Sequence, residues 1–156
     1  MQIYLVQHGV CAVEGDDGEK VLTGEGREQT RRIAEVAKGY NVVVEKIVHS
    51  GKKRAQQTAE IYHTALQVVT PLEHVEGINP LDDVTSFSWR IKSLSDCLIV
   101  GHMPFMQKLV SYLTTGNENI KVYQFQNSGL VCLGAEKGEE GPLDWSIQWT
   151  LNPRIS

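Results

Sequence analysis

Short apolar runs alternate along the chain with longer segments in which apolar residues recur at helical spacing. Residues 3–6 and 97–100 are nearly continuous apolar runs, and residues 47–48 form a shorter one. Runs of this kind are typical of strands that are buried on both faces, as in a parallel sheet covered by helices. We therefore predict three buried strands at these positions.

Segments with helical signals follow these strands. After a polar loop through residues 16–18, Thr23 can cap a helix that runs to about Lys38, where Gly39 supplies the stop. Residues 52–67 place small and apolar side chains on one face and predict an amphipathic helix. Pro104 stands where a further helix can begin, and its expected apolar face is formed by Phe105, Met106, Leu109, Val110 and Leu113.

The second half of the chain is less regular. Residues 68–96 are broken by proline and glycine, and within them only residues 84–93 look weakly helical. Residues 143–151 alternate strictly between apolar and polar side chains, which predicts a half-buried antiparallel or edge strand. Residues 130–133 are its expected hairpin partner across a turn at residues 138–142. The whole pattern predicts an α/β fold, a three-layer sandwich with a mostly parallel central sheet and helices on both faces.

Composition limits the number of domains and the classes of function that this chain can have. The chain has 156 residues, of which 41% are hydrophobic, so we expect one compact domain over residues 1–156. Its net charge of -4 argues against a general nucleic-acid binder. Cys11, Cys97 and Cys132 have no paired spacing, which favours a reducing cytoplasm over a disulfide framework or a thiolate metal site. No segment has the length of a membrane span, and the N-terminus carries no basic leader, so we expect no membrane association.

Two histidines stand at the ends of predicted strands. His8 follows residues 3–6 and precedes Gly9, while His102 follows residues 97–100 and Gly101. In open α/β sheets, ligands bind beyond the carboxyl ends of the strands. Each histidine alone could be a hydrogen-bonded structural residue. Arg54 lies at a third strand-to-helix junction, after Ser50 as a possible cap, where helix N–H groups and a guanidinium suit a phosphoryl group.

Four stretches of the chain resemble the motifs of the histidine phosphatase superfamily, whose fold is phosphoglycerate mutase-like. They are LVQHG at residues 5–9, LTGEG at residues 22–26, Ser50 with Arg54, Ala55 and Thr58, and VGHMP at residues 100–104. They are spread over most of the chain in the family's order, and the length is most similar to that of the small SixA-like phosphohistidine phosphatases. The resemblance implies a mixed, predominantly parallel sheet with helices on both faces.

The resemblance also implies roles. His8 would be the nucleophile that becomes phosphohistidine, Arg54 and His102 would line the phosphate pocket, and Gly9 and Ser128 would lie beside it. A neutral imidazole is a competent nucleophile near pH 7, and the charge on the phosphoryl oxygens can be met by preorganised donors. This chemistry requires no metal and no other cofactor. The implied substrate is a protein bearing phosphohistidine or a small phosphorylated molecule.

Two features depart from the family pattern. Gln7 stands where the family places an arginine, so the pocket loses a charged donor. Lys52 or Lys53 could restore this charge, but we favour the interpretation of both as solvated surface residues. The general acid has no clear position; Glu76, Asp82 and Asp83 are the candidates. Two hypotheses follow: an active phosphatase that acts on protein phosphohistidine, or a weakened phosphate- or phosphoprotein-binding module on the same fold. A mutase is a distant third, because no insertion encloses a small substrate.

Overall fold

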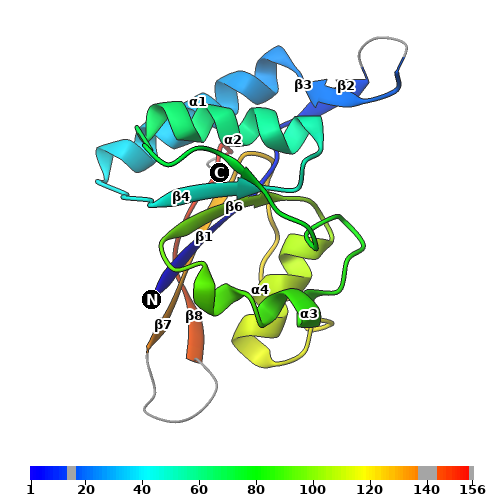
Figure 1. Cartoon of the computed structure of the whole chain (residues 1–156), viewed down its shortest axis with the longest axis vertical. Coiled ribbons are helices and arrows are strands. Elements are labelled where there is room, and N and C mark those ends of the chain that lie inside the picture. The colour runs from blue at the N-terminus through cyan, green and yellow to red at the C-terminus, as the bar shows by residue number, and fades with distance from the viewer. Residues whose placement is uncertain (14–16, 137–143, 155–156) are drawn as a thin grey trace.

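The structure, a computed structural model, describes residues 1–13, 17–136 and 144–154. A six-stranded sheet in the order β5-β4-β6-β1-β7-β8 forms its centre (Figure 1). The strands are β1 (Gln2–Gln7), β4 (Lys46–His49), β5 (Glu73–His74), β6 (Cys97–Gly101), β7 (Leu130–Glu136) and β8 (Asp144–Leu151). Strands β5, β4, β6 and β1 run parallel, β7 runs antiparallel to β1, and β8 runs antiparallel to β7. The predicted mostly parallel sheet is confirmed.

Strand β1 shows why its sequence is a continuous apolar run. Successive side chains of a strand point to opposite faces of the sheet. Ile3 and Leu5 pack into one hydrophobic core, and Tyr4 and Val6 pack into another. All four are buried, so both faces of the strand need apolar side chains.

Helices cover the two faces of the sheet (Figure 1). Helices α1 (Gly24–Gly39) and α2 (Lys53–Ala65) pack over one core, while α3 (Val84–Ser88), the 3-10 turn η1 (Ile91–Ser93) and α4 (Phe105–Thr115) pack over the other. The three-layer arrangement is therefore confirmed. Thr23 caps α1 as expected, because its hydroxyl accepts a hydrogen bond from the N–H of Gly26 at 3.0 Å.

Three local predictions were imprecise. Gly39 is the last residue of α1 rather than its stop, and Tyr40 is the C-cap, followed by Asn41 in the left-handed region with φ 58°. Lys52, not Ser50, occupies the N-cap position of α2. Residues 84–93 form two short helical pieces, α3 and η1, rather than one continuous helix.

Three strands were not predicted. Strands β2 (Cys11–Val13) and β3 (Lys20–Leu22) form an antiparallel hairpin, where only a polar loop was expected. Strand β5 contributes two residues to the edge of the sheet beside β4.

The C-terminal hairpin is as predicted. Strand β8 pairs antiparallel with β7, and its Trp145 is buried while the neighbouring Asp144 and Ser146 are exposed. The expected turn at residues 138–142 lies outside the described residues. None of the helices in the described ranges is long and apolar enough to span a membrane.

Candidate active site

Three neighbouring strands bring the sequence-predicted residues to one edge of the sheet. Strand β6 lies between β1 and β4, with Gly101 opposite Gln7 and Val100 opposite His49. Because the three strands run parallel, their carboxyl ends meet at the same edge, and the residues that follow these ends are close in space. The backbone N–H of His8 donates to the carbonyl of Gly101 at 3.0 Å, which joins the segments of the two histidines directly.

The tautomer of His8 follows from its backbone contact. Its Nδ1 lies 2.8 Å from the carbonyl oxygen of Gly9. A carbonyl can only accept, so the proton resides on Nδ1 and the lone pair of the neutral ring is on Nε2. Burial lowers the pKa of His8, and although the hydrogen bond to Gly9 opposes this shift, the charges of Arg54 and Lys20 lower the pKa further. His8 therefore carries an available lone pair at neutral pH.

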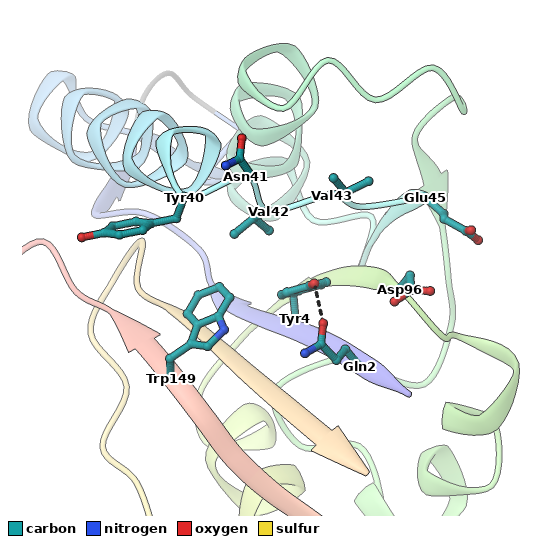
Figure 2. A pocket seen from close by; sticks show the side chains of 9 residues that line it. All are labelled: Gln2, Tyr4, Tyr40, Asn41, Val42, Val43, Glu45, Asp96 and Trp149. Carbon is teal, nitrogen blue, oxygen red and sulfur yellow. Dashed lines mark hydrogen bonds between the residues drawn. The ribbon is translucent and has the colours of Figure 1, made fainter. Parts of the chain in front are cut away.

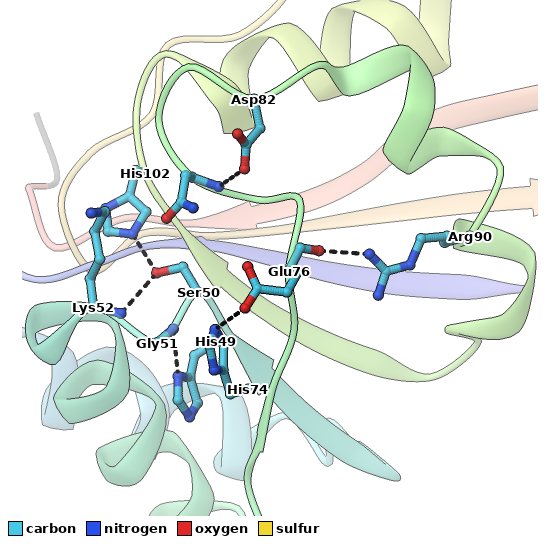
Figure 3. A network of polar contacts seen from close by, with 10 residues as sticks. His49, Ser50, Gly51, Lys52, His74, Glu76, Asp82, Arg90 and His102 are labelled. Carbon is cyan, nitrogen blue, oxygen red and sulfur yellow. Dashed lines mark hydrogen bonds and ion pairs between the residues drawn. The ribbon is translucent and has the colours of Figure 1, made fainter.

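His102 faces His8 from the end of β6. The two ring centroids are 5.1 Å apart and the ring planes are inclined by 52°. His102 is only 1% exposed, and its Nε2 lies 2.6 Å from the hydroxyl of Ser50 (Figure 3). Burial, together with the repulsion of a charged His102 ring by Arg54, by Lys52 and by His8 when it is protonated, lowers the pKa of His102 to about 3. The ring is therefore neutral at physiological pH.

Positive charge gathers around the two rings. Arg54 lies in the first turn of α2, where the helix dipole also favours an anion, although the N–H of Lys53 already donates to the Glu19 carboxylate. Its charge acts on both His8 and His102. Lys52 was expected to be a solvated surface residue, but it is half-buried and its side chain lies beside His102 (Figure 3).

Lys20 was missed by sequence reasoning. It lies on β3, and the hairpin is tied to α2 because Glu19 accepts the N–H of Lys53 at 3.1 Å. The charge of Lys20 thereby reaches His8. No local sequence signal marked this residue, because the hairpin itself was not predicted.

The other predicted phosphate-binding residues support the segment that carries His8. The N–H of Gly9 donates to the Thr58 hydroxyl at 2.9 Å. Ser128 is fully buried; its hydroxyl lies 2.7 Å from that of Thr30, and its N–H donates to the carbonyl of Gln7 at 3.0 Å. Contact of Gln7, Gly9 and Ser128 with phosphate stays a prediction.

The three candidate acids form local contacts. Glu76 pairs with His74 at 3.5 Å and Asp82 accepts the N–H of Asn79 at 2.8 Å (Figure 3). Asp83 caps α3. These partners lie in β5, in α3 and in the connection between them, and among the described residues no hydrogen bond or ion pair joins the three carboxylates to His8 or His102.

A separate hollow of about 430 Å³ lies at the other end of the sheet (Figure 2). It is bordered by Gln2 at the start of β1, whereas His8 follows the end of this strand. The hollow is therefore a full strand length, about 20 Å, from the histidines. Among the described residues, no group of three or more His, Cys, Asp or Glu side chains could hold a metal ion.

The fold and the site define an α/β protein with two neutral histidines and an arginine at the carboxyl edge of its sheet, an arrangement suited to an anion. The sequence profile of the histidine phosphatase superfamily (branch 1) matches residues 3–82, which is half of the chain. The chain belongs to this superfamily.

Individual relatives agree with this membership. The phosphohistidine phosphatase SixA of Escherichia coli (strain K12) is 26% identical over 153 residues, covering 94% of this chain and 93% of the relative. An uncharacterized protein of Picosynechococcus sp. is 30% identical over 112 residues, which is 67% of each chain. The structure of the protein histidine phosphatase SixA complexed with tungstate superposes with a TM-score of 0.83 at 23% identity, covering 98% of this chain and 97% of that one. The expected fold is confirmed.

Proposed function

We propose that this protein is a phosphatase that transfers a phosphoryl group to Nε2 of His8 and then hydrolyses the phosphohistidine. One observation carries the proposal: the Nδ1 proton of His8 is fixed on the carbonyl of Gly9, which leaves a lone pair on Nε2 beside Arg54 and His102. A nucleophile with positioned cationic and hydrogen-bond donors is the arrangement that phosphoryl transfer requires.

The reaction has two displacements. In the first, Nε2 attacks phosphorus, the bond from phosphorus to the substrate breaks, and the leaving group keeps the electron pair and takes up a proton. In the second, water attacks phosphorus, the bond to Nε2 breaks, and inorganic phosphate leaves with one proton released. The hydrogen bond from Nδ1 to Gly9 assists the second displacement, because a ring that retains its Nδ1 proton departs as neutral imidazole rather than as an anion.

The proposed substrate is phosphohistidine on a protein surface. The candidate acids Glu76, Asp82 and Asp83 have their contacts in β5, in α3 and in the connection between them, so an alcohol leaving group would find no positioned proton donor among them. An imidazole leaving group is basic enough to take its proton from solvent. The connection from α2 to β6 forms β5, α3 and η1, and α3 packs on the α4 side of the sheet. Because this connection is used for elements of the fold, it favours an open site that admits a protein surface. The names of two relatives, phosphohistidine phosphatase SixA and protein histidine phosphatase SixA, support this substrate class.

A second candidate function is a phosphate- or phosphoprotein-binding module. Gln7 favours it, because an uncharged side chain replaces an arginine that the family places beside the nucleophile. Lys52 and Lys20 favour the enzyme, because their charges act on His102 and His8 and offset part of this loss.

The test compares turnover of a protein bearing phosphohistidine with turnover of p-nitrophenyl phosphate. We expect faster turnover of phosphohistidine and an acid-labile phosphoenzyme in the wild type, and neither in His8→Ala. His63→Ala is the matched control, because His63 lies at the end of α2 and contacts the carbonyl of Thr70. Unchanged turnover in His8→Ala would remove the mechanism, whereas vanadate binding without any turnover would favour the binding module.

A further inference from the structure

The side chain of His102 has one nitrogen with a partner and one without. Nε2 lies 2.6 Å from the Ser50 hydroxyl (Figure 3). Nδ1 is buried and has no hydrogen-bond partner in the described part of the chain, where it is the one side-chain polar atom in this state. An unpaired buried polar atom is costly, and it indicates a missing partner. The His102 ring lies 5.1 Å from the His8 ring, and the charge of Arg54 acts on it, so a phosphoryl group bound at the proposed site would supply the missing partner.

We propose that Ser50 is a positioning residue that donates its hydroxyl proton to Nε2 of His102 and thereby fixes the ring as the tautomer whose Nδ1–H donates to the phosphoryl group. This inference rests on the proposed function, and it names the origin of one of the donors in the pocket. It also assigns a role to Ser50 other than the helix cap expected from the sequence.

The choice of tautomer decides whether His102 attracts or repels the substrate. A neutral imidazole has one N–H and one lone pair. Phosphoryl oxygens only accept hydrogen bonds, so a lone pair on Nδ1 would point at them without a proton between. With the proton on Nδ1, the same atom becomes a donor in a buried site, where such donors contribute strongly to transition-state stabilisation.

The hydrogen bonds of Ser50 fix which atom donates. Its hydroxyl oxygen accepts the N–H of Lys52 at 3.4 Å, and its second hydrogen bond within the described residues is the one to His102. If Nε2 carried the proton, Ser50 would accept twice and its own proton would have no acceptor. If Ser50 donates to Nε2, the hydroxyl accepts once and donates once, and all its groups are satisfied.

A tight turn keeps the Ser50 hydroxyl in place. Ser50 follows the last residue of β4 and is buried, and Gly51 adopts a left-handed backbone with φ 87°. The N–H of Gly51 donates to Nδ1 of His49 at 3.1 Å. The ring of His74 lies against Gly51, so that a side chain at position 51 would collide with it (Figure 3). Ser50 is thus held between the strand and a packed turn, and does not depend on substrate for its orientation.

The first measurement reads the tautomer directly. Nitrogen-15 NMR of the wild type at pH 7 should show His102 with a protonated Nδ1 and an unprotonated Nε2. In Ser50→Ala the two nitrogens should move toward a mixture of tautomers. Ser111→Ala is the matched control, because it removes another buried hydroxyl, on α4, whose partner is the carbonyl of Gln107. It should leave the His102 signals unchanged. A protonated Nε2 in the wild type would overturn the proposal.

The second measurement separates the tautomer from a purely structural role of Ser50. An asparagine at position 102 places an amide N–H₂ group near the position of Nδ1. This group can donate a hydrogen bond to the phosphoryl group regardless of which residue stands at position 50. Ser50→Ala should weaken vanadate binding and kcat/KM roughly tenfold in the wild type, which corresponds to the loss of one hydrogen bond. It should change vanadate binding less than about twofold in His102→Asn. Equal losses in both backgrounds would show that Ser50 only supports the fold.

Two further results keep the outcomes distinct. Ser50→Thr restores a hydroxyl and should recover the wild-type tautomer and vanadate affinity; a folded Ser50→Thr with the Ser50→Ala spectrum would count against the proposal. Neither the NMR spectrum nor vanadate binding requires turnover. A protein that shows the expected tautomer but forms no phosphoenzyme would therefore refute the proposed function and leave the role of Ser50 intact.

Discussion

Substitution of Gln7 by arginine should strengthen the anion site. Gln7 is the half-buried last residue of β1, and it pairs with Gly101. Because side chains alternate along a strand, Gln7 leaves the sheet on the side of Ile3 and Leu5, which is the α4 side. Helix α2 with Arg54 lies on the other side. An arginine at position 7 would therefore approach the phosphoryl group from the side opposite Arg54.

The expected gain follows from replacing a neutral donor by a charged one. A charge-assisted hydrogen bond contributes about 1.5 to 3 kcal/mol. We expect about 1.4 to 2.7 kcal/mol, which is roughly tenfold to hundredfold in affinity or rate. A further cation beside His8 should also lower the pKa of His8, in the same direction as Arg54 does.

The assay is vanadate binding at constant ionic strength, together with kcat/KM on a protein bearing phosphohistidine. Gln7→Lys is the matched control, because it adds charge without the planar fork, and it should give an intermediate gain. If Gln7→Arg folds with an unchanged urea midpoint but neither quantity moves, then residue 7 does not face the phosphoryl group or Lys52 already fills the role. Tighter binding without turnover would identify a binding module.

Three further predictions concern Arg54, His102 and Tyr62. Arg54→Met should weaken vanadate binding about hundredfold and raise the pKa of His8, which NMR titration can follow; an unchanged pKa would contradict the placement of Arg54. The unfolded state should bind a proton on His102 near pH 6.5, whereas the folded state resists protonation down to about 3. His102 should thus make stability fall with decreasing pH below 6.5, by at most about 1.4 kcal/mol per pH unit, in the same direction as His8, whose pKa is also lowered. In urea titrations the slope should therefore be smaller in His102→Asn than in the wild type. Tyr62→Phe should cost about 1 to 2 kcal/mol, because it removes a buried hydrogen bond to the carbonyl of Ser128. A cost below about 0.5 kcal/mol in urea would contradict this.

The sequence predicted those elements whose pattern is set by burial on two faces. The runs at residues 3–6 and 97–100 became β1 and β6 because each side chain meets one of two cores. The positions of His8 and His102 followed from the parallel order of these strands. That part of the site could be predicted from the sequence because the prediction requires only the positions of the strand ends and no tertiary contacts.

The missed parts depend on contacts between distant residues. Strands β2 and β3 have only three residues each, which is too short for a periodic pattern to identify them, and Ala12 and Val13 are exposed although they are apolar. Lys20 reaches the site only through this hairpin. Ser50 lies before a helix and resembles a cap, but its partner is His102, and no local pattern indicates a hydrogen bond over this separation.

Gly9 and Gly26 show that a packing constraint can make a position as intolerant of substitution as a catalytic role does. A Cβ at Gly26 would lie 2.1 Å from the carbonyl oxygen of Val10, and one at Gly9 would lie 2.9 Å from the Thr30 hydroxyl and 3.1 Å from the carbonyl of Gly26. The first turn of α1 therefore packs directly against the backbone of the residues that follow His8. In a saturation mutagenesis screen, both positions should tolerate glycine alone, with a profile as strict as that of His8. A strict requirement for glycine beside His8 would then reflect the close approach of two backbone segments and not a role in catalysis. Vanadate binding by the folded variants would distinguish these two explanations.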